Sequence, residues 1–280
     1  MDRETLRKVQ QTMLEIAKEI KRVCEENNIR YFLCCGTLLG AVRHGGFIPW
    51  DDDMDLGMLR ADYEKFCRIA PEKLRPEFCL QSWYTEPGYA LPFAKVRLRN
   101  TLYVEAKSAP LQERGFYIDI FPFDFAPETE QAQSSHAGKL AELFRLKLMK
   151  SGAKPWEEMG RINWKKRIGY LYYQAKALPY SGDALVEKYD LLAKSVPESS
   201  VLCRQRGFYK LDCYERSWYE ELADYAFEGE LFPGPKDYDT VLTRQFGDYM
   251  TPPPKGEREE RHQIVLVDFG DGTPRWEKNA

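Results

Sequence analysis

Residues 50–56 read WDDDMDL, which places four aspartates within five positions and next to the apolar Met54 and Leu56. From Asp53 onward, acidic and apolar residues alternate, which is the period of a half-buried β-strand. Asp53 and Asp55 therefore point to the same face of that strand. Carboxylates held so close oppose one another's ionisation unless a cation lies between them. The stretch predicts a strand that binds a divalent metal, against the alternative of a solvated acidic loop.

A second apolar stretch, YIDIF at residues 117–121, carries the single carboxylate Asp119. An ionised aspartate buried in such a strand without a partner is costly. We expect this strand to lie beside the first, so that Asp119 joins Asp53 and Asp55 in one site. Oxygen ligands of this kind suit Mg²⁺ or Mn²⁺. The alternative is that backbone donors or an arginine satisfy Asp119.

The stretch CGTLLG at residues 35–40 precedes the acidic strand and predicts a turn from a strand into a helix. At such a turn the small Gly36 and the hydroxyl of Thr37 allow backbone N–H groups to approach a phosphate. Arg43 and His44 follow the turn and are candidates for contact with a phosphate or an acceptor. Surface roles for these two residues remain open.

Lys95 and Arg97 alternate along a further strand and share a face. They are candidates to neutralise a diphosphate, with simple surface pairing as the alternative. Two denser basic runs, at 165–167 and 204–206, are interpreted as solvated faces.

The apolar periodicity predicts an α+β fold with one packed sheet, a helical partner region and an ordered C-terminal arm. Asp62 is a candidate cap for the helix that follows the acidic strand. Expected helices cover residues 3–27, 62–70, 128–150, 164–177 and 182–194, and expected strands cover 29–35, 53–56, 78–83, 93–98 and 116–121.

The composition argues against several classes of protein. The chain has 280 residues, with 41 basic and 44 acidic side chains, so its net charge of -3 provides no overall basic field for nucleic acid. Seven cysteines without a C-x-x-C pair favour a reducing cytoplasm over a disulfide framework. The longest apolar stretch, at residues 31–42, is shorter than the roughly 20 residues that a membrane helix needs. We expect a cytoplasmic protein and leave peripheral contact with a membrane open.

The whole pattern resembles the nucleotidyltransferase superfamily: the Gly-Thr turn, a spacer, the acidic strand and then the isolated Asp119. Within that superfamily, GTLLGAVRHGGFIPWDDD at residues 36–53 is similar to the signature of the LicD family. That family includes bacterial phosphocholine transferases and the fukutin-related glycan phosphotransferases. The resemblance continues at residues 95–97, 118–122 and 238–253 but is loose over 130–230. Thr37 stands where the superfamily usually has serine, which retains the hydroxyl.

The resemblance implies a single domain over residues 1–280, with a nucleotidyltransferase-like mixed-sheet core at about 25–127. A helical region at about 128–230 and a C-terminal arm at 231–280 would complete it. The implied reaction moves a phospho-alcohol group, typically phosphocholine from CDP-choline, onto a sugar hydroxyl, and CMP leaves. Asp53, Asp55 and Asp119 would be the catalytic residues and would hold two Mg²⁺ or Mn²⁺ ions. His262 would lie near the site, with an exposed surface histidine as the alternative.

Three other functions remain open. The transferred unit could be a nucleotidyl, glycerol-phosphate, aminoethyl-phosphonate or sugar-phosphate group, or the chain could be a binding module without catalysis. A nucleic-acid polymerase or tRNA-modifying role is disfavoured by the net charge. The expected partners are a CDP-linked donor and a glycan or glycolipid acceptor, at the inner face of a membrane, and no nucleic acid.

Overall fold

A mixed β-sheet lies at the centre of the computed structural model, which describes residues 1–86, 88–106, 114–152, 157–158, 161–205, 212–260 and 262–278. Within these residues the sheet has seven strands, and five of them run in the order β1–β2–β6–β4–β3. β9 pairs with β6 and carries β10. β2 and β6 are parallel, and the other pairs are antiparallel. The strands are β1 (Phe32–Leu33), β2 (Asp55–Leu59), β3 (Phe78–Gln81), β4 (Ala94–Leu98), β6 (Tyr117–Phe125), β9 (Val201–Arg204) and β10 (Asp212–Glu215).

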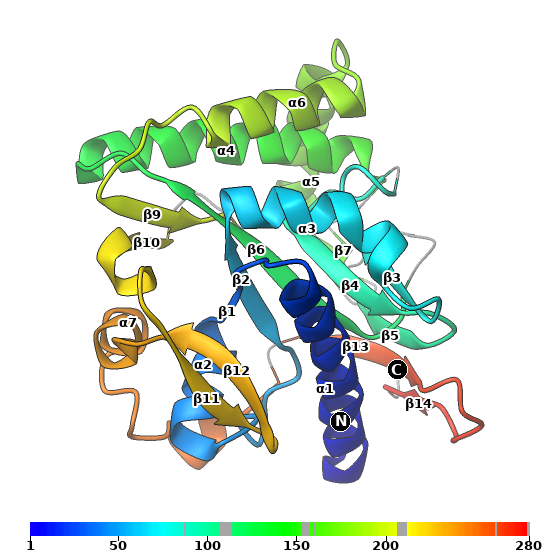
Figure 1. The fold of residues 1–280 in the computed structure, drawn as a ribbon. Helices are drawn as coiled ribbons and strands as arrows, with labels where there is room; N and C mark the ends of the chain where they lie inside the picture. The colour runs from blue at the N-terminus through cyan, green and yellow to red at the C-terminus, as the bar shows by residue number, and fades with distance from the viewer. Residues whose placement is uncertain are drawn as a thin grey trace.

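Two helices, α1 (Arg3–Glu26) and α3 (Arg60–Lys73), cover the same face of this sheet (Figure 1). α1 forms because its apolar residues recur every three or four positions, which gathers them on one side of a helix. Asp2 caps its first turn by accepting a hydrogen bond from the Thr5 backbone N–H at 2.8 Å. The buried side of α1 includes Leu6, Val9, Met13, Ile16, Ile20 and Val23.

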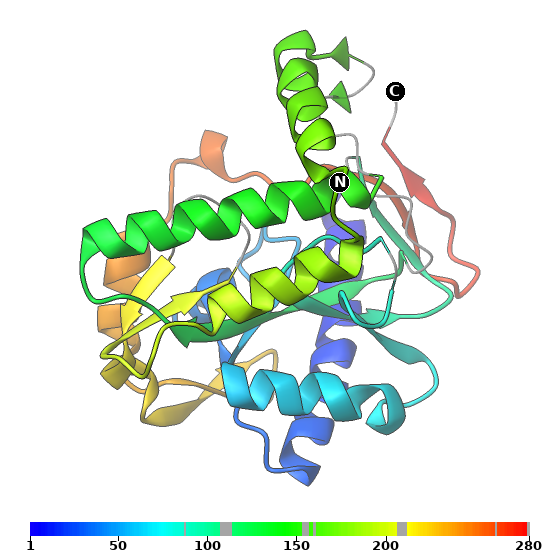
Figure 2. The same ribbon diagram turned by 90° about the horizontal axis from the view of Figure 1, so that it is seen from above.

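Three further helices follow the long strand β6, and two of them run side by side above β9 (Figure 1). α4 (Glu130–Lys150) packs against both α6 (Gly182–Ala193) and α5 (Trp164–Ala177). Each of the three begins at a side-chain cap, provided in turn by Thr129, Asn163 and Ser181. Figure 2 shows α5 standing away from the rest of the molecule.

The remaining elements surround the sheet. α2 (Cys35–His44) contacts α7 (Tyr238–Phe246) and the hairpin of β11 (Leu222–Phe227) and β12 (Glu230–Pro235). A small sheet joins β5 (Leu102–Glu105), β13 (Ile264–Asp268) and β14 (Trp276–Glu277). The short elements are β7 (Glu157–Glu158), β8 (Arg161–Ile162), η1 (Arg216–Tyr219) and η2 (Lys255–Glu257).

The α+β class that the sequence predicted is confirmed, and the helices expected up to residue 194 are present. The helical region expected over 128–230 is wrong beyond α6. After Ala193 the described chain contains strands, and α7 is its only later α-helix. Asp62 is not the cap of α3, because that helix begins at Arg60 and Asp62 lies in its first turn. Within the described residues, no helix has both the length and the apolar character needed to cross a membrane.

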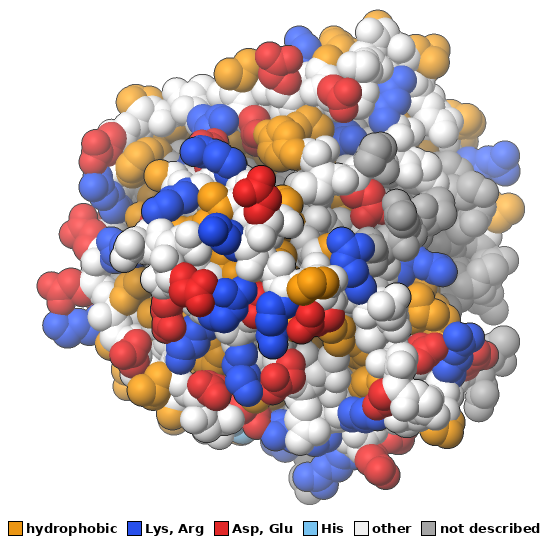
Figure 3. Space-filling view, turned by 45° about the vertical axis from the view of Figure 1, so that its right-hand side comes forward, with side chains coloured by type: hydrophobic (Ala, Val, Ile, Leu, Met, Phe, Trp, Pro, Cys, Tyr) orange, Lys and Arg blue, Asp and Glu red, His pale blue; other side chains and the backbone are white. Residues whose placement is uncertain are grey.

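Charged side chains of both signs are interspersed on the face drawn in Figure 3. Lys and Arg side chains alternate there with Asp and Glu, so that face presents no extended basic surface. This agrees with the small net charge of the whole chain.

Gly57 lies in the middle of β2, under the rings of Phe32 and Phe123. These rings meet edge to face with 5.0 Å between their centroids, and Tyr219 contacts both. An added Cβ at Gly57 would overlap Phe32 and lie 2.8 Å from Phe123 Cε2. The requirement at this position is space for the two rings.

We expect Gly57→Ala to lower the free energy of unfolding by about 1–3 kcal/mol, because an overpacked core must shift its rings or its backbone. Chemical denaturation measures the change. Gly138→Ala is the matched control, because nothing surrounds that exposed glycine of α4 within 4 Å. It should gain up to about 1 kcal/mol from helix propensity. Equal stability of the two variants would contradict this account of Gly57.

Candidate active site

Three polar residues stand side by side across the middle of the sheet. Asp55 of β2 is the register partner of Asp119 of β6, and Asp119 is in turn the partner of Lys95 of β4. Neighbouring strands lie about 4.8 Å apart, so this register places the three side chains in one row. Asp119 therefore lies between a carboxylate on one side and an ammonium group on the other.

This row opens into a cavity of about 550 Å³. The side chains that face it belong to segments far apart in the chain, including the start of α2, β2, β4, β6, β9 and the segment before β13. Six residues singled out from the sequence line it: Gly36, Asp53, Asp55, Lys95, Asp119 and His262. The sequence therefore located five of the ten charged or amide side chains in this lining and did not select Asp51, Glu105, Arg204, Asp212 and Gln245.

Burial and mutual repulsion act on the aspartates of this cavity. Burial raises the pKa of Asp55 well above that of an ordinary aspartate, and the charges of Asp53 and Asp119 raise it further. Burial also raises the pKa of Asp53, against the opposing charge of His262. A divalent cation relieves this repulsion, and carboxylate oxygens are the ligands that hard cations prefer. The donor set therefore fits a metal ion.

Lys95 is held in place by Asp119 and by the ring of Tyr117. Its Nζ lies 2.5 Å from Asp119 Oδ1 and 3.4 Å from the centroid of the Tyr117 ring. The hydroxyl of Tyr117 donates to Glu105 Oε1 at 2.7 Å. Because Lys95 is buried among these groups, its positive charge is fixed at the wall of the cavity rather than dispersed into solvent.

α2 connects the Gly-Thr turn to the acidic strand. Thr37 is buried, and its Oγ1 accepts a hydrogen bond from the Asp55 backbone N–H at 2.8 Å. Gly36 lies in the first turn of α2, where an added Cβ would lie 2.9 Å from Asp51 Oδ2. The N-terminus of a helix attracts anions, and here it faces the cavity. Thr37 thus positions Asp55, and Gly36 leaves the helix end accessible.

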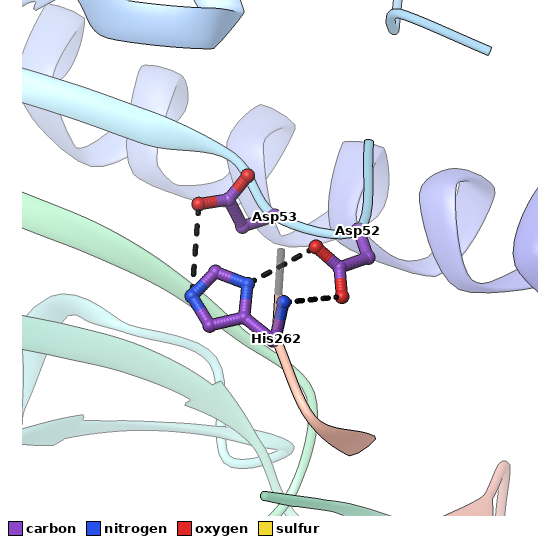
Figure 4. A group of neighbouring side chains, drawn as sticks. All are labelled: Asp52, Asp53 and His262. Atoms are coloured by element: carbon purple, nitrogen blue, oxygen red, sulfur yellow. Dashed lines mark hydrogen bonds and ion pairs between the residues drawn. The ribbon is translucent and has the colours of Figure 1, made fainter. Parts of the chain in front are cut away.

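His262 joins the two aspartates that precede β2 (Figure 4). Its Nδ1 lies 3.1 Å from Asp52 Oδ1, its backbone N–H donates to Asp52 Oδ2, and its Nε2 lies 3.9 Å from Asp53 Oδ2. Burial opposes protonation of the imidazole, but the hydrogen bond to Asp52 and the charge of Asp53 outweigh it and raise the pKa of His262 to about 9. Asp52 is fully buried behind the histidine.

Among the described residues, Asp52, Asp53 and His262 form a group whose ligand atoms all lie within 4.8 Å of one another, close enough to hold a metal ion. This group shares only Asp53 with the three aspartates expected from the sequence. Asp52 does not line the cavity, and both its oxygens contact His262. A buried carboxylate in that position orients an imidazole, so we assign Asp52 to holding His262 rather than to the cavity wall.

Four residues expected near phosphate lie outside the cavity lining: Thr37, whose hydroxyl is bound to the Asp55 backbone, and Arg43, His44 and Arg97. Arg97 does share a face with Lys95, and both cations lie over the Tyr117 ring, but its Nε and Nη1 donate to Gln81 Oε1 and the Gly115 carbonyl, each at 2.6 Å. Arg43 Nη1 donates to the Tyr249 carbonyl at 2.5 Å. His44 is exposed. Contact of these residues with phosphate remains a prediction, because none of them lines the cavity.

Arg204 is a cavity residue that the sequence reasoning missed. The run 204–206 was interpreted as a solvated face, yet Arg204 is 5% exposed and lines the cavity. Its Nη2 lies 2.7 Å from Asp212 Oδ2, its Nη1 contacts the Cys35 sulfur, and its Nε has no hydrogen-bond partner within the described chain. No local pattern signals this, because Arg204 reaches the site only through the pairing of β9 with β6. Arg206 lies outside the described residues.

Comparison with known families agrees with this geometry. Residues 28–147 match the model of the LicD/FKTN/FKRP nucleotidyltransferase domain, and this range contains α2, β2, β4 and β6. The chain is therefore an enzyme of the transferase type, built on a nucleotidyltransferase domain. Within that class, the domain at residues 28–147 matches the LicD family.

Two kinds of relative illustrate the family. The chain is 26% identical over 266 residues to the lipopolysaccharide cholinephosphotransferase LicD of Haemophilus influenzae, covering 94% of this chain and 97% of that protein. It is 50% identical over 48 residues to the ribitol 5-phosphate transferase FKRP of Homo sapiens and of Mus musculus. That match covers 17% of this chain and only 10% of either relative.

We expect Thr37→Val to lower the free energy of unfolding by about 1–3 kcal/mol, because the buried Asp55 N–H loses its acceptor while the side-chain volume is kept. Thr37→Ser keeps the acceptor and should recover most of the loss. Thermal and chemical unfolding of the three proteins measure the effect. A valine variant as stable as the serine variant would show that the bond does not hold β2.

Proposed function

We propose that this enzyme transfers phosphocholine from CDP-choline to a hydroxyl of a glycan or glycolipid. The observation that carries the proposal is the row of Asp55, Asp119 and Lys95 facing one cavity, which combines acidic ligands with a fixed cation. The likeness to the Haemophilus cholinephosphotransferase over almost the full length of both chains supports the choice of group.

The reaction breaks the phosphoric anhydride bond of the donor and forms a phosphate ester with the acceptor. An oxygen of the acceptor forms a bond to the phosphorus that carries choline, and the bond from that phosphorus to the bridging oxygen breaks. CMP leaves with the bridging oxygen. The proton of the acceptor hydroxyl passes to a carboxylate, and one of the three cavity aspartates is placed to receive it.

Asp53, Asp55 and Asp119 would hold two Mg²⁺ or Mn²⁺ ions, which supply positive charge to the donor's diphosphate and to the departing CMP. Positively charged groups of the protein itself would also neutralise the diphosphate of the donor. Lys95 and Arg204 lie on the cavity wall, and the N-terminus of α2 at Gly36 attracts a phosphate oxygen. Phosphoryl transfer depends mainly on such positioning and neutralisation, so no covalent intermediate with the protein is required.

An aromatic wall supports the choice of a quaternary ammonium headgroup. Trp50, Phe93, Phe121 and Phe246 line the same cavity as the aspartates. Aromatic faces attract quaternary ammonium ions, because their ring electrons are the negative end of a quadrupole. We expect choline to lie against this wall while its phosphate lies toward Lys95.

A CDP-linked donor of a different phospho-alcohol is the alternative substrate. The short match to the ribitol 5-phosphate transferases favours transfer of a different phospho-alcohol from a CDP-linked donor. The metal and phosphate residues would be unchanged, and only the headgroup wall would differ. We further propose that the reaction takes place in the cytoplasm, at the inner face of a membrane. The seven free thiols suit a reducing compartment.

We expect the purified chain to release CMP from CDP-choline when Mg²⁺ or Mn²⁺ and a glycan acceptor are present. Asp55→Asn and Asp119→Asn should each lower turnover on the order of 100-fold or more, because each removes a ligand charge. Asp62→Asn, in the first turn of α3 and outside the cavity, is the matched control and should keep its activity. Chromatography of the nucleotide products measures all four proteins. Turnover of another CDP-linked donor without CDP-choline would replace the substrate, and full activity of both asparagine variants would reject the site.

Titration with a metal ion can distinguish the site of Asp53, Asp55 and Asp119 from the group of Asp52, Asp53 and His262. We expect isothermal titration with Mn²⁺ to show weaker binding, on the order of tenfold or more, after Asp119→Asn. His262→Gln should change the affinity less, because we assign the histidine to the cavity wall and not to the metal. A larger loss in the His262 variant than in the Asp119 variant would move the metal to the group of Asp52, Asp53 and His262.

A further inference from the structure

One side of α5 is a stripe of large apolar side chains in contact with solvent. Trp164, Ile168 and Leu171 are 64%, 59% and 56% exposed, and Tyr172 is 60% exposed. Successive residues of a helix are 100° apart, so positions 164, 168, 171 and 172 fall on one side of it. Leu178, which follows the helix and is 75% exposed, continues the same line. Exposed apolar stripes of this kind mark interaction surfaces.

The opposite side of α5 holds the helix to the molecule. Ala177 is buried and Tyr173 is half-buried against the cluster that contains Leu146 of α4. Arg145 of α4 donates to the Tyr173 hydroxyl at 2.8 Å, and Lys176 pairs with Glu142 of the same helix. The apolar stripe is therefore separate from the packing side, and Figure 2 shows the helix projecting from the body.

The charge of α5 has a single sign. The helix contains Lys165, Lys166, Arg167 and Lys176 and no acidic residue, so it carries +4 within a chain whose net charge is -3. At 100° per residue, Lys165 and Lys176 border one margin of the stripe and Arg167 borders the other. An apolar stripe bordered by basic residues on both sides is the arrangement of helices that lie in the interface of a bilayer.

We propose that α5 docks this protein on the surface of an anionic membrane, with the helix axis in the plane of the bilayer. The apolar stripe enters the headgroup region, where Trp and Tyr side chains are favoured. The basic residues meet anionic headgroups, each at a gain of about 1 kcal/mol near the surface. Charge complementarity favours an anionic membrane over a second copy of the chain. The α5 helix of a second copy would bring the same basic residues, and the two helices would repel each other.

The reaction cavity and α5 lie on the same side of the central sheet. Ile118 and Ile120 are fully buried in the core that includes residues of α1, whereas the alternate residues Asp119 and Phe121 line the cavity. The cavity therefore opens on the side of the sheet opposite α1 and α3. Figure 2 shows α5 projecting on that same side of the sheet. The docking itself does not depend on which group is transferred.

The test is flotation of the full chain with lipid vesicles. Vesicles of phosphatidylcholine with about 30% phosphatidylglycerol should carry the protein upward at about 0.1 M salt, and phosphatidylcholine alone should not. Raising the salt to about 1 M should release much of the bound protein, because exposed charges are then screened over about 3 Å. Failure of the wild-type chain to float with the anionic vesicles would overturn the proposal.

Paired variants separate the stripe from the charges. Ile168→Asp with Leu171→Asp should lower the bound fraction about tenfold or more, since both changes place a carboxylate in the apolar stripe. Lys165→Glu with Arg167→Glu, on the exposed surface, should lower it through charge while keeping the stripe. Leu231→Asp is the control, because Leu231 is 54% exposed on the distant hairpin of β11 and β12 and should float like the wild type.

CMP release from a water-soluble acceptor should be the same in all four proteins, which shows that the variants are folded and catalytically intact. Unchanged flotation of both double variants would reject α5 as the docking element. Sedimentation velocity tests the second copy as occupant. A dimer that Leu171→Asp dissociates, without vesicle binding by the wild type, would assign the stripe to self-association instead.

Discussion

Repulsion between carboxylates on two adjacent parallel strands governs the arrangement of this molecule. Asp55 and Asp119 are opposite one another because β2 and β6 are in parallel register, and burial raises the cost of charging Asp55 and Asp53. Three basic side chains offset that cost. They are Lys95 beside Asp119, Arg204 from β9, and His262 beside Asp53. Each of these cations arrives from a different part of the chain. Strands of the central sheet and the C-terminal segment are therefore both needed to assemble one cavity.

Much of this arrangement could be predicted from local patterns. The alternation after Asp53 and the isolated Asp119 indicated two strands with inward carboxylates, and the structure pairs those strands. Helices with clear apolar periods and good caps, such as α1 and α5, were also predicted within a residue or two of their ends. These features depend on interactions within about one helical turn or one strand, so a single sequence contains them.

The rest depends on contacts between distant segments. Arg204 looks like one residue of a basic surface run, and only the pairing of β9 with β6 turns it into a cavity residue. Asp52 is one more carboxylate of the acidic run in the sequence, and only the approach of His262 from more than 200 residues away gives it this partner. Likewise Arg97 was expected at a phosphate, but Gln81 and Gly115 bind its guanidinium. No spacing rule in the sequence encodes such tertiary partners.

The row of Asp55, Asp119 and Lys95 also restricts how the chain can fold. Because side chains alternate along a strand, a slip of one residue in β6 would turn Asp119 toward the apolar layer of α1 and bring Ile118 or Ile120 to the cavity. Such a misaligned state would bury a carboxylate in hydrocarbon and separate it from Lys95, at a cost of several kcal/mol. The residues proposed for chemistry therefore also disfavour misaligned strand registers during folding. A neutral substitution at Asp119 would remove this penalty, and more registers of β6 would become accessible.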